Sequence, residues 1–171
     1  MLSVLALVAV VVPAAGARSG HASRARSARA VLQQGILQQL NALRASHHLK
    51  PLTLSPSLNA VSLQHTKEMA ARGYFAHDSA DGSAFWKRIR RVYGVSGYSF
   101  WSVGENLLWQ EPNVDPAAAI RLWLASPEHK RNMLDPRWRE IGIAAVHVDA
   151  APGVYGGQPV TIVTTDFGVR R

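Results

Sequence analysis

The sequence predicts an α+β domain with helices first and strands last. Apolar residues recur at helical spacing over residues 31–72, whereas two segments near the C-terminus are rich in β-branched residues. Separation of helices from strands along the chain is typical of layered α+β domains. The 171 residues, 47% of them apolar, show no internal repeat and fit one globular domain with tails.

The N-terminal 30 residues differ in composition from the rest. Residues 1–17 form a short apolar run that Pro13 and small residues close, which predicts a secretory signal peptide. Residues 18–30 hold four arginines among Ser, Ala and Gly, and supply half of the net charge of +8. We interpret 18–30 as an Arg-rich disordered linker, with a polyanion-binding arm as the alternative. The folded domain is then expected to cover residues 31–171.

Helix signals follow in order along the domain. The stripe of Leu32, Ile36, Leu40 and Leu43 predicts an amphipathic helix over 31–47. The pair Ser55-Pro56 begins a second helix, which Gly73 ends. Residues 85–92 fit a short basic helix, and the cap signals Asp115-Pro116 and Ser126-Pro127 begin two more.

Strand signals are concentrated at the C-terminus. Residues 141–148 and 160–167 predict a β-hairpin joined by a long Pro- and Gly-rich loop. A further strand is expected near residues 102–109.

Three polar residues stand in apolar or aromatic surroundings, and each has a structural as well as a functional interpretation. His77 follows two aromatic residues, Glu105 is followed by Asn106 and an apolar run, and His129 falls in the first turn of a helix. Helix N-terminal dipoles disfavour a charged imidazole there, which keeps the metal-binding neutral form. Two imidazoles and a carboxylate suffice for an open zinc-type site. Alternatively, these are loop, packing and helix-start residues. The chain has no cysteine and no familiar catalytic motif.

Taken together, several segments resemble the CAP superfamily (cysteine-rich secretory proteins, antigen 5, pathogenesis-related proteins) in its bacterial SCP-like extracellular branch. The similarity covers residues 31–168. The segments that carry it are LNALRASHHLKPLTLSPSLNAVSLQHTKEMAARGYFAHDSADGS, VGENLLW, WLASPEHKRNMLDPRWREIGIAA and TTDFG. Each segment is a modest signal, but their order and spacing are specific.

The resemblance implies a three-layer α-β-α sandwich with a central antiparallel sheet. It also implies a cleft formed by His77, Glu105, Asn106 and His129, in which His77 and His129 hold a divalent cation such as zinc. The helix before His129 lacks the second glutamate of many eukaryotic relatives, and Glu128 replaces a glycine of the bacterial motif. Glu128 either supplies the missing carboxylate or, as we expect, lies at the surface beside His129.

The sequence predicts a secreted binding module that acts without turnover. Its ligand is a divalent cation or a small or extended molecule of the extracellular space or the cell envelope. The alternative is a metal-assisted hydrolase of peptide or cell-wall bonds, in which His77 and His129 hold the metal and Glu105 acts as general base. A third hypothesis is polyanion binding through the arginines of 18–30. We expect a monomer and no specific nucleic-acid binding.

Overall fold

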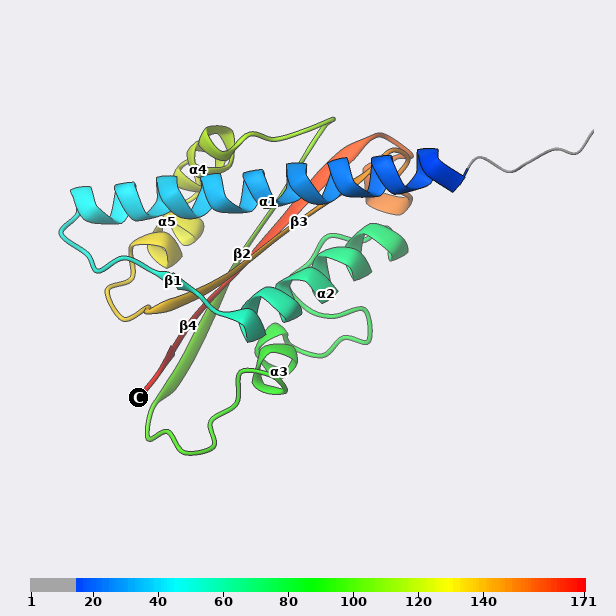
Figure 1. Cartoon of the computed structure of the whole chain (residues 1–171). Coiled ribbons are helices and arrows are strands. Elements are labelled where there is room, and N and C mark those ends of the chain that lie inside the picture. Colours follow the sequence, from blue (N-terminus) through cyan, green and yellow to red (C-terminus); the bar gives the residue numbers. More distant parts are fainter. Residues whose placement is uncertain (1–14) are drawn as a thin grey trace, which may run out of the picture.

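A four-stranded sheet lies between two layers of helices (Figure 1). The computed structural model describes residues 15–171, with side chains from residue 27 onward, so most of the predicted signal peptide lies outside it. In chain order the elements are α1 (Ala15–Ser46), β1 (Thr53–Leu54), α2 (Pro56–Arg72), α3 (Phe85–Arg90), β2 (Trp101–Gln110), α4 (Pro116–Leu124), α5 (Pro127–Leu134), β3 (Glu140–Val148), a 3-10 turn (Gly153–Tyr155) and β4 (Val160–Arg170).

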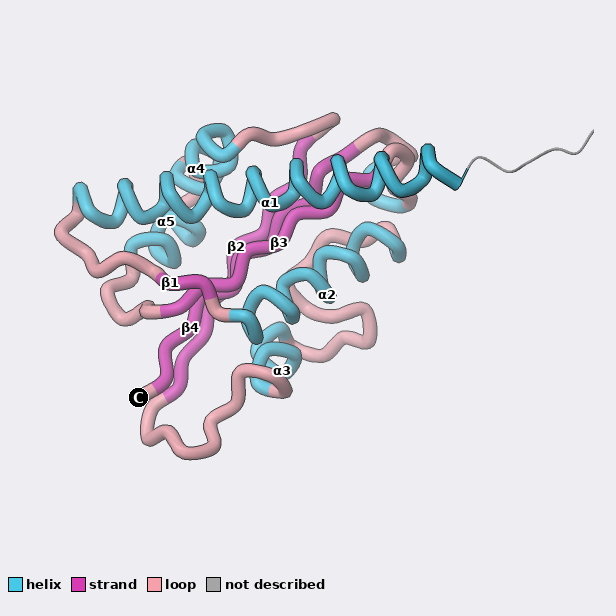
Figure 2. The backbone as a smooth tube through the Cα atoms, viewed as in Figure 1, coloured by secondary structure: helices cyan, strands magenta, loops and turns pink. Residues whose placement is uncertain are grey.

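The strand order is β1-β3-β4-β2, with β4 antiparallel to both β2 and β3. The strands are the magenta segments between the helices in Figure 2. The expected central antiparallel sheet forms from β2, β4 and β3, and at one edge the two-residue β1 adds a parallel pairing with β3. A strand of two residues is too short to produce an alternating pattern, so the sequence holds no signal for it. The predicted hairpin and the additional strand near 102–109 are confirmed.

Each face of the sheet carries its own helices, which confirms the three-layer arrangement. Helices α1, α4 and α5 cover one face around Ile36, Leu40 and Trp123, and α2 and α3 cover the other (Figure 1). The predicted caps form as expected: Asp115 accepts a hydrogen bond from the Ala118 N–H at 2.8 Å, and Gly73 ends α2 with φ 69°.

Residues 18–30 are helical, which corrects the predicted disordered linker. Helix α1 begins at Ala15 and continues through this segment into the amphipathic part that packs on the sheet. Ala and Arg are strong helix formers, and the segment contains no proline to end a helix. In the described part of the chain, no helix combines the length and apolar character of a membrane span.

Helix α2 packs directly on β3 at Gly142. A Cβ atom at this position would lie 2.2 Å from the Leu58 carbonyl carbon and 2.6 Å from the Asn59 backbone nitrogen. Backbone atoms cannot move aside as a flexible side chain does, so glycine here sets the distance between α2 and the sheet.

We therefore expect Gly142→Ala to lower the free energy of unfolding by about 3 kcal/mol, because the added methyl group forces α2 off the sheet. Urea denaturation measures this loss. Gly94→Ala is the matched control, since its Cβ would meet nothing closer than the Arg90 carbonyl oxygen at 3.4 Å. Equal stability of the two variants would contradict the packing argument.

Candidate functional site

The candidate site is built around two neighbouring residues of β2, the edge strand of the sheet. Glu105 and Asn106 are 3% and 0% exposed, and successive side chains of a strand point to opposite faces. Glu105 therefore points into the layer of α2 and α3, and Asn106 into the layer of α5. One strand thus holds polar groups from both helical layers.

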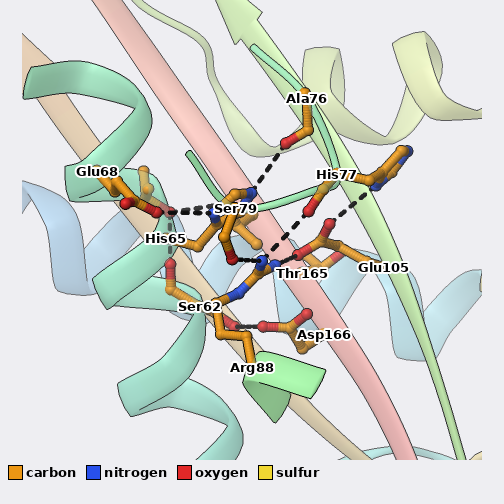
Figure 3. Close-up of polar contacts among 12 residues, drawn as sticks. Ser62, His65, Glu68, Ala76, His77, Ser79, Arg88, Glu105, Thr165 and Asp166 are labelled. Carbon is orange, nitrogen blue, oxygen red and sulfur yellow. Dashed lines mark hydrogen bonds and ion pairs between the residues drawn. The ribbon is translucent and has the colours of Figure 1, made fainter. Parts of the chain in front are cut away.

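Glu105 fixes the loop that carries His77 (Figure 3). His77 Nδ1 lies 2.8 Å from Glu105 Oε1, and the Arg88 guanidinium pairs with Glu105 Oε2. Arg88 also donates to the His77 carbonyl oxygen at 3.2 Å and to Ser79 Oγ at 3.1 Å. Since the carboxylate accepts at Nδ1–H, Nε2 is the ring nitrogen left for a ligand. The His77 side chain is 51% exposed.

Asn106 fixes the first turn of α5, which carries His129. Its side-chain amide donates to the His129 carbonyl oxygen at 3.0 Å, and its Oδ1 accepts from Asn132 at 2.8 Å. Asn132 also donates to the Glu105 carbonyl oxygen at 3.0 Å. The His129 ring is half-buried, whereas Glu128 is exposed, as we expected.

A hollow of about 220 Å³ lies beside this edge of the sheet. His129 borders it, together with Phe75 from the loop that also carries His77, whereas His77 and Glu105 do not line it. The remaining lining residues are Leu107, Leu108, Trp109, Gln110, Leu122 and Trp123. The hollow therefore extends the histidine region with a mainly apolar wall.

Both histidines have lowered pKa values. Burial and the nearby Arg88 lower the pKa of His77, and burial and the charge of His77 lower the pKa of His129. Both shifts favour the neutral imidazole at pH 7, the form that the sequence predicts for His129, although the main cause in the structure is burial. Burial raises the pKa of Glu105 to about 7, although Arg88 acts against this rise.

The donor set fits an open cation site better than a closed one. Among residues 27–171, whose side chains the structure describes, no group of three or more His, Cys, Asp or Glu side chains is placed to hold a metal ion. His77 and His129 supply two neutral imidazoles, whereas both oxygens of Glu105 are engaged by His77 and Arg88. A carboxylate behind a histidine is the usual support of a metal-ligating imidazole. In this arrangement Glu105 supports His77 and has no free oxygen to act as a base.

Sequence reasoning missed several residues of the site. Arg88 is buried although it belongs to a short basic helix, and Asp166 is buried within β4. His65 is fully buried and its Nε2 lies 2.9 Å from the Ala76 carbonyl oxygen, beside His77. The sequence held one signal that Asp166 is buried, since it is the single acid among the β-branched residues of a strand with the composition of a core strand.

Comparison with known proteins gives consistent results. The model of the cysteine-rich secretory protein family (CAP) matches residues 37–164. YkwD of Bacillus subtilis is 26% identical over 135 residues, which are 78% of this chain and 50% of the relative. The membrane protein YlbC of the same organism is 26% identical over 65% of this chain and 30% of its own length. The chain thus spans half or less of these relatives.

Solved structures show the same fold. An extracellular SCP-domain protein of Bacillus anthracis superposes with a TM-score of 0.66 at 27% identity, over 87% of this chain and 43% of the other. An outer surface protein of Borrelia burgdorferi gives a TM-score of 0.62 at 18% identity, over 79% of this chain and 90% of the other.

The ion pair at the centre of the site leads to a stability prediction. Arg88→Met leaves Glu105 buried without its cation, so we expect the free energy of unfolding to fall by about 3 kcal/mol at pH 8. The loss is smaller at pH 5, because a raised pKa lets Glu105 take up a proton there. Denaturant unfolding at the two pH values measures both effects. Arg90 is an exposed residue of the same helix, α3, so Arg90→Met is the control, and we expect it to change the free energy of unfolding by less than about 0.5 kcal/mol. An equal loss at both pH values would refute the electrostatic role.

Proposed function

The chain belongs to the CAP family, and from this premise we propose that it is an extracellular binding module whose histidine cleft captures a divalent cation or a small or extended ligand. The observation that carries the proposal is the pair of histidines, His77 and His129, which the buried residues Glu105 and Asn106 hold on the two sides of β2 through the His77 ring and the His129 carbonyl oxygen. Neutral imidazoles with a free ring nitrogen bind metal ions and accept hydrogen bonds from ligands.

Binding without turnover is favoured by the groups around the histidines. Ser126 is the nearest hydroxyl in sequence to His129, but it serves as the N-cap of α5 and accepts from the His129 N–H at 3.5 Å. Glu105 is committed to His77 and Arg88. Nucleophilic catalysis requires a nucleophile in contact with a base, and this region offers no such pair among the described residues.

An extracellular location is supported by the relatives and by the N-terminal sequence. The Bacillus anthracis relative is described as extracellular and the Borrelia burgdorferi protein as an outer surface protein. Residues 1–17 have the composition of a secretory signal.

Zinc titration tests the cation part of the proposal. We expect isothermal titration calorimetry to show one Zn²⁺ per chain, and His77→Ala or His129→Ala to weaken binding tenfold or more, in the range of about 10- to 100-fold known for disturbed metal sites. The affinity for zinc falls when the pH drops below the pKa values of His77 and His129, which burial lowers from the ordinary value of about 6.5, because protons then compete for the imidazoles. His47→Ala, an exposed histidine at the end of α1, is the control that leaves binding unchanged. Equal affinity of the His129→Ala and His47→Ala variants would reject a shared site.

Metal-assisted hydrolysis is the second candidate, favoured by the carboxylate-supported ring of His77. The binding proposal expects no release of products from casein or cell-wall peptides at saturating zinc. Cleavage that disappears in His129→Ala but persists in His47→Ala would instead establish the hydrolase.

A further inference from the structure

Asp166 on β4 is a second buried carboxyl group directly opposite Glu105. The register of β2 and β4 pairs these two residues, so their side chains lie on the same face of the sheet. Asp166 is 0% exposed. Its Oδ2 lies 2.6 Å from Ser62 Oγ of α2 (Figure 3), and its Oδ1 is buried without a hydrogen-bond partner in the described part of the chain.

The charges around this pair do not balance if both acids are ionised. Arg88 pairs with Glu105, and the nearby histidines, His65 and His77, have lowered pKa values and are neutral at pH 7. Two buried carboxylates would therefore face one cation. An unpaired buried charge is among the most costly features in a fold, and a titratable group in this position takes up a proton instead.

The other acids near the histidines do not restore the balance. Asp78, next to His77, is exposed, and the Glu68 side chain, 3.9 Å from His65, is 27% exposed. A carboxyl group carries no positive charge in either protonation state, so neither residue can balance a second buried anion.

The hydrogen bonds of Ser62 are consistent with the same protonation state. Ser62 Oγ lies within hydrogen-bond distance of both the Leu58 carbonyl oxygen, at 2.9 Å, and Asp166 Oδ2. A hydroxyl has a single hydrogen, so it cannot donate fully to both acceptors. A proton on Asp166 supplies the missing donor, because the acid then donates to Ser62 and Ser62 donates to Leu58.

We propose that Asp166 is a neutral carboxylic acid in the native protein, a positioning residue whose neutrality leaves Glu105, among the described residues, as the single buried anion facing Arg88 and His77. Between the two acids, Asp166 keeps the proton, because Glu105 has both a cation and an imidazole as partners. Burial and the neighbouring Glu105 also raise the pKa of Asp166 well above its ordinary value. The inference deepens the proposed function, since the single charge on Glu105 orients the ring of His77.

The test compares unfolding of the wild type and Asp166→Asn between pH 5 and pH 7 without any ligand. The unfolded chain releases the Asp166 proton near the ordinary pKa of about 4, whereas the native state keeps it, so wild-type stability falls as pH rises. Asparagine carries no titrating proton. We therefore expect the ratio of the unfolding constants, wild type over variant, to rise about tenfold per pH unit. A constant ratio would mean that Asp166 is ionised in the fold and would overturn the proposal.

Two further measurements complete the experiment. Glu111→Gln makes the same change of acid to amide at an exposed position and is the matched control. For this variant we expect the ratio of the unfolding constants, wild type over variant, to stay constant between pH 5 and pH 7. If Asp166→Asn does not fold, infrared spectroscopy of the wild type with ¹³C-labelled aspartate decides: we expect a protonated carboxyl band at pH 7, and its absence refutes the proposal. Neither measurement involves zinc. A failure of zinc binding therefore does not affect the test of Asp166, and an ionised Asp166 would not by itself reject the zinc site.

Discussion

The buried contact between Glu105 and Arg88 is the constraint on which the site depends. Both side chains are almost fully removed from water, where an unpaired charge would be unstable. Arg88 belongs to α3, Glu105 belongs to the edge strand, and their pairing fixes the loop between α2 and α3. The half-exposed ring of His77 is thus positioned by two side chains that are almost fully buried. Rigid support of this kind lowers the entropic cost of binding.

The same edge strand organises the opposite layer through Asn106. Because consecutive residues of a strand point to opposite faces, two adjacent positions reach α3 on one side and α5 on the other. The two histidines come from segments far apart in the sequence. Adjacent residues of β2 nevertheless hold both of them, since Glu105 contacts the ring of His77 and Asn106 binds the carbonyl oxygen of His129. Any shift of β2 in its register with β4 would disturb both rings together.

Much of this architecture could be predicted from the sequence. Cap residues such as Asp115 and Ser126 located the helix starts, and β-branched segments located β3 and β4, because these signals are local. The family resemblance supplied the site residues, of which the structure brings His77 into contact with Glu105, and Asn106 into contact with the backbone of His129. Arg88 and Asp166 were missed because their roles arise from tertiary burial. Arg88 lies in a run of basic residues of the kind that usually faces solvent, and Asp166 comes to lie opposite Glu105 only through the register of β2 and β4.

Capping of the sheet margins has a consequence for self-association. Outward-facing carbonyl groups of Glu105 and Leu107 are occupied by Asn132 and by the Trp123 indole N–H, and on the other margin Asn59 accepts from the Ile143 N–H. Unpaired strand margins are templates on which foreign strands assemble into aggregates. Because side chains of the same molecule already satisfy these three groups, a foreign strand would have to displace them before it could pair at these positions.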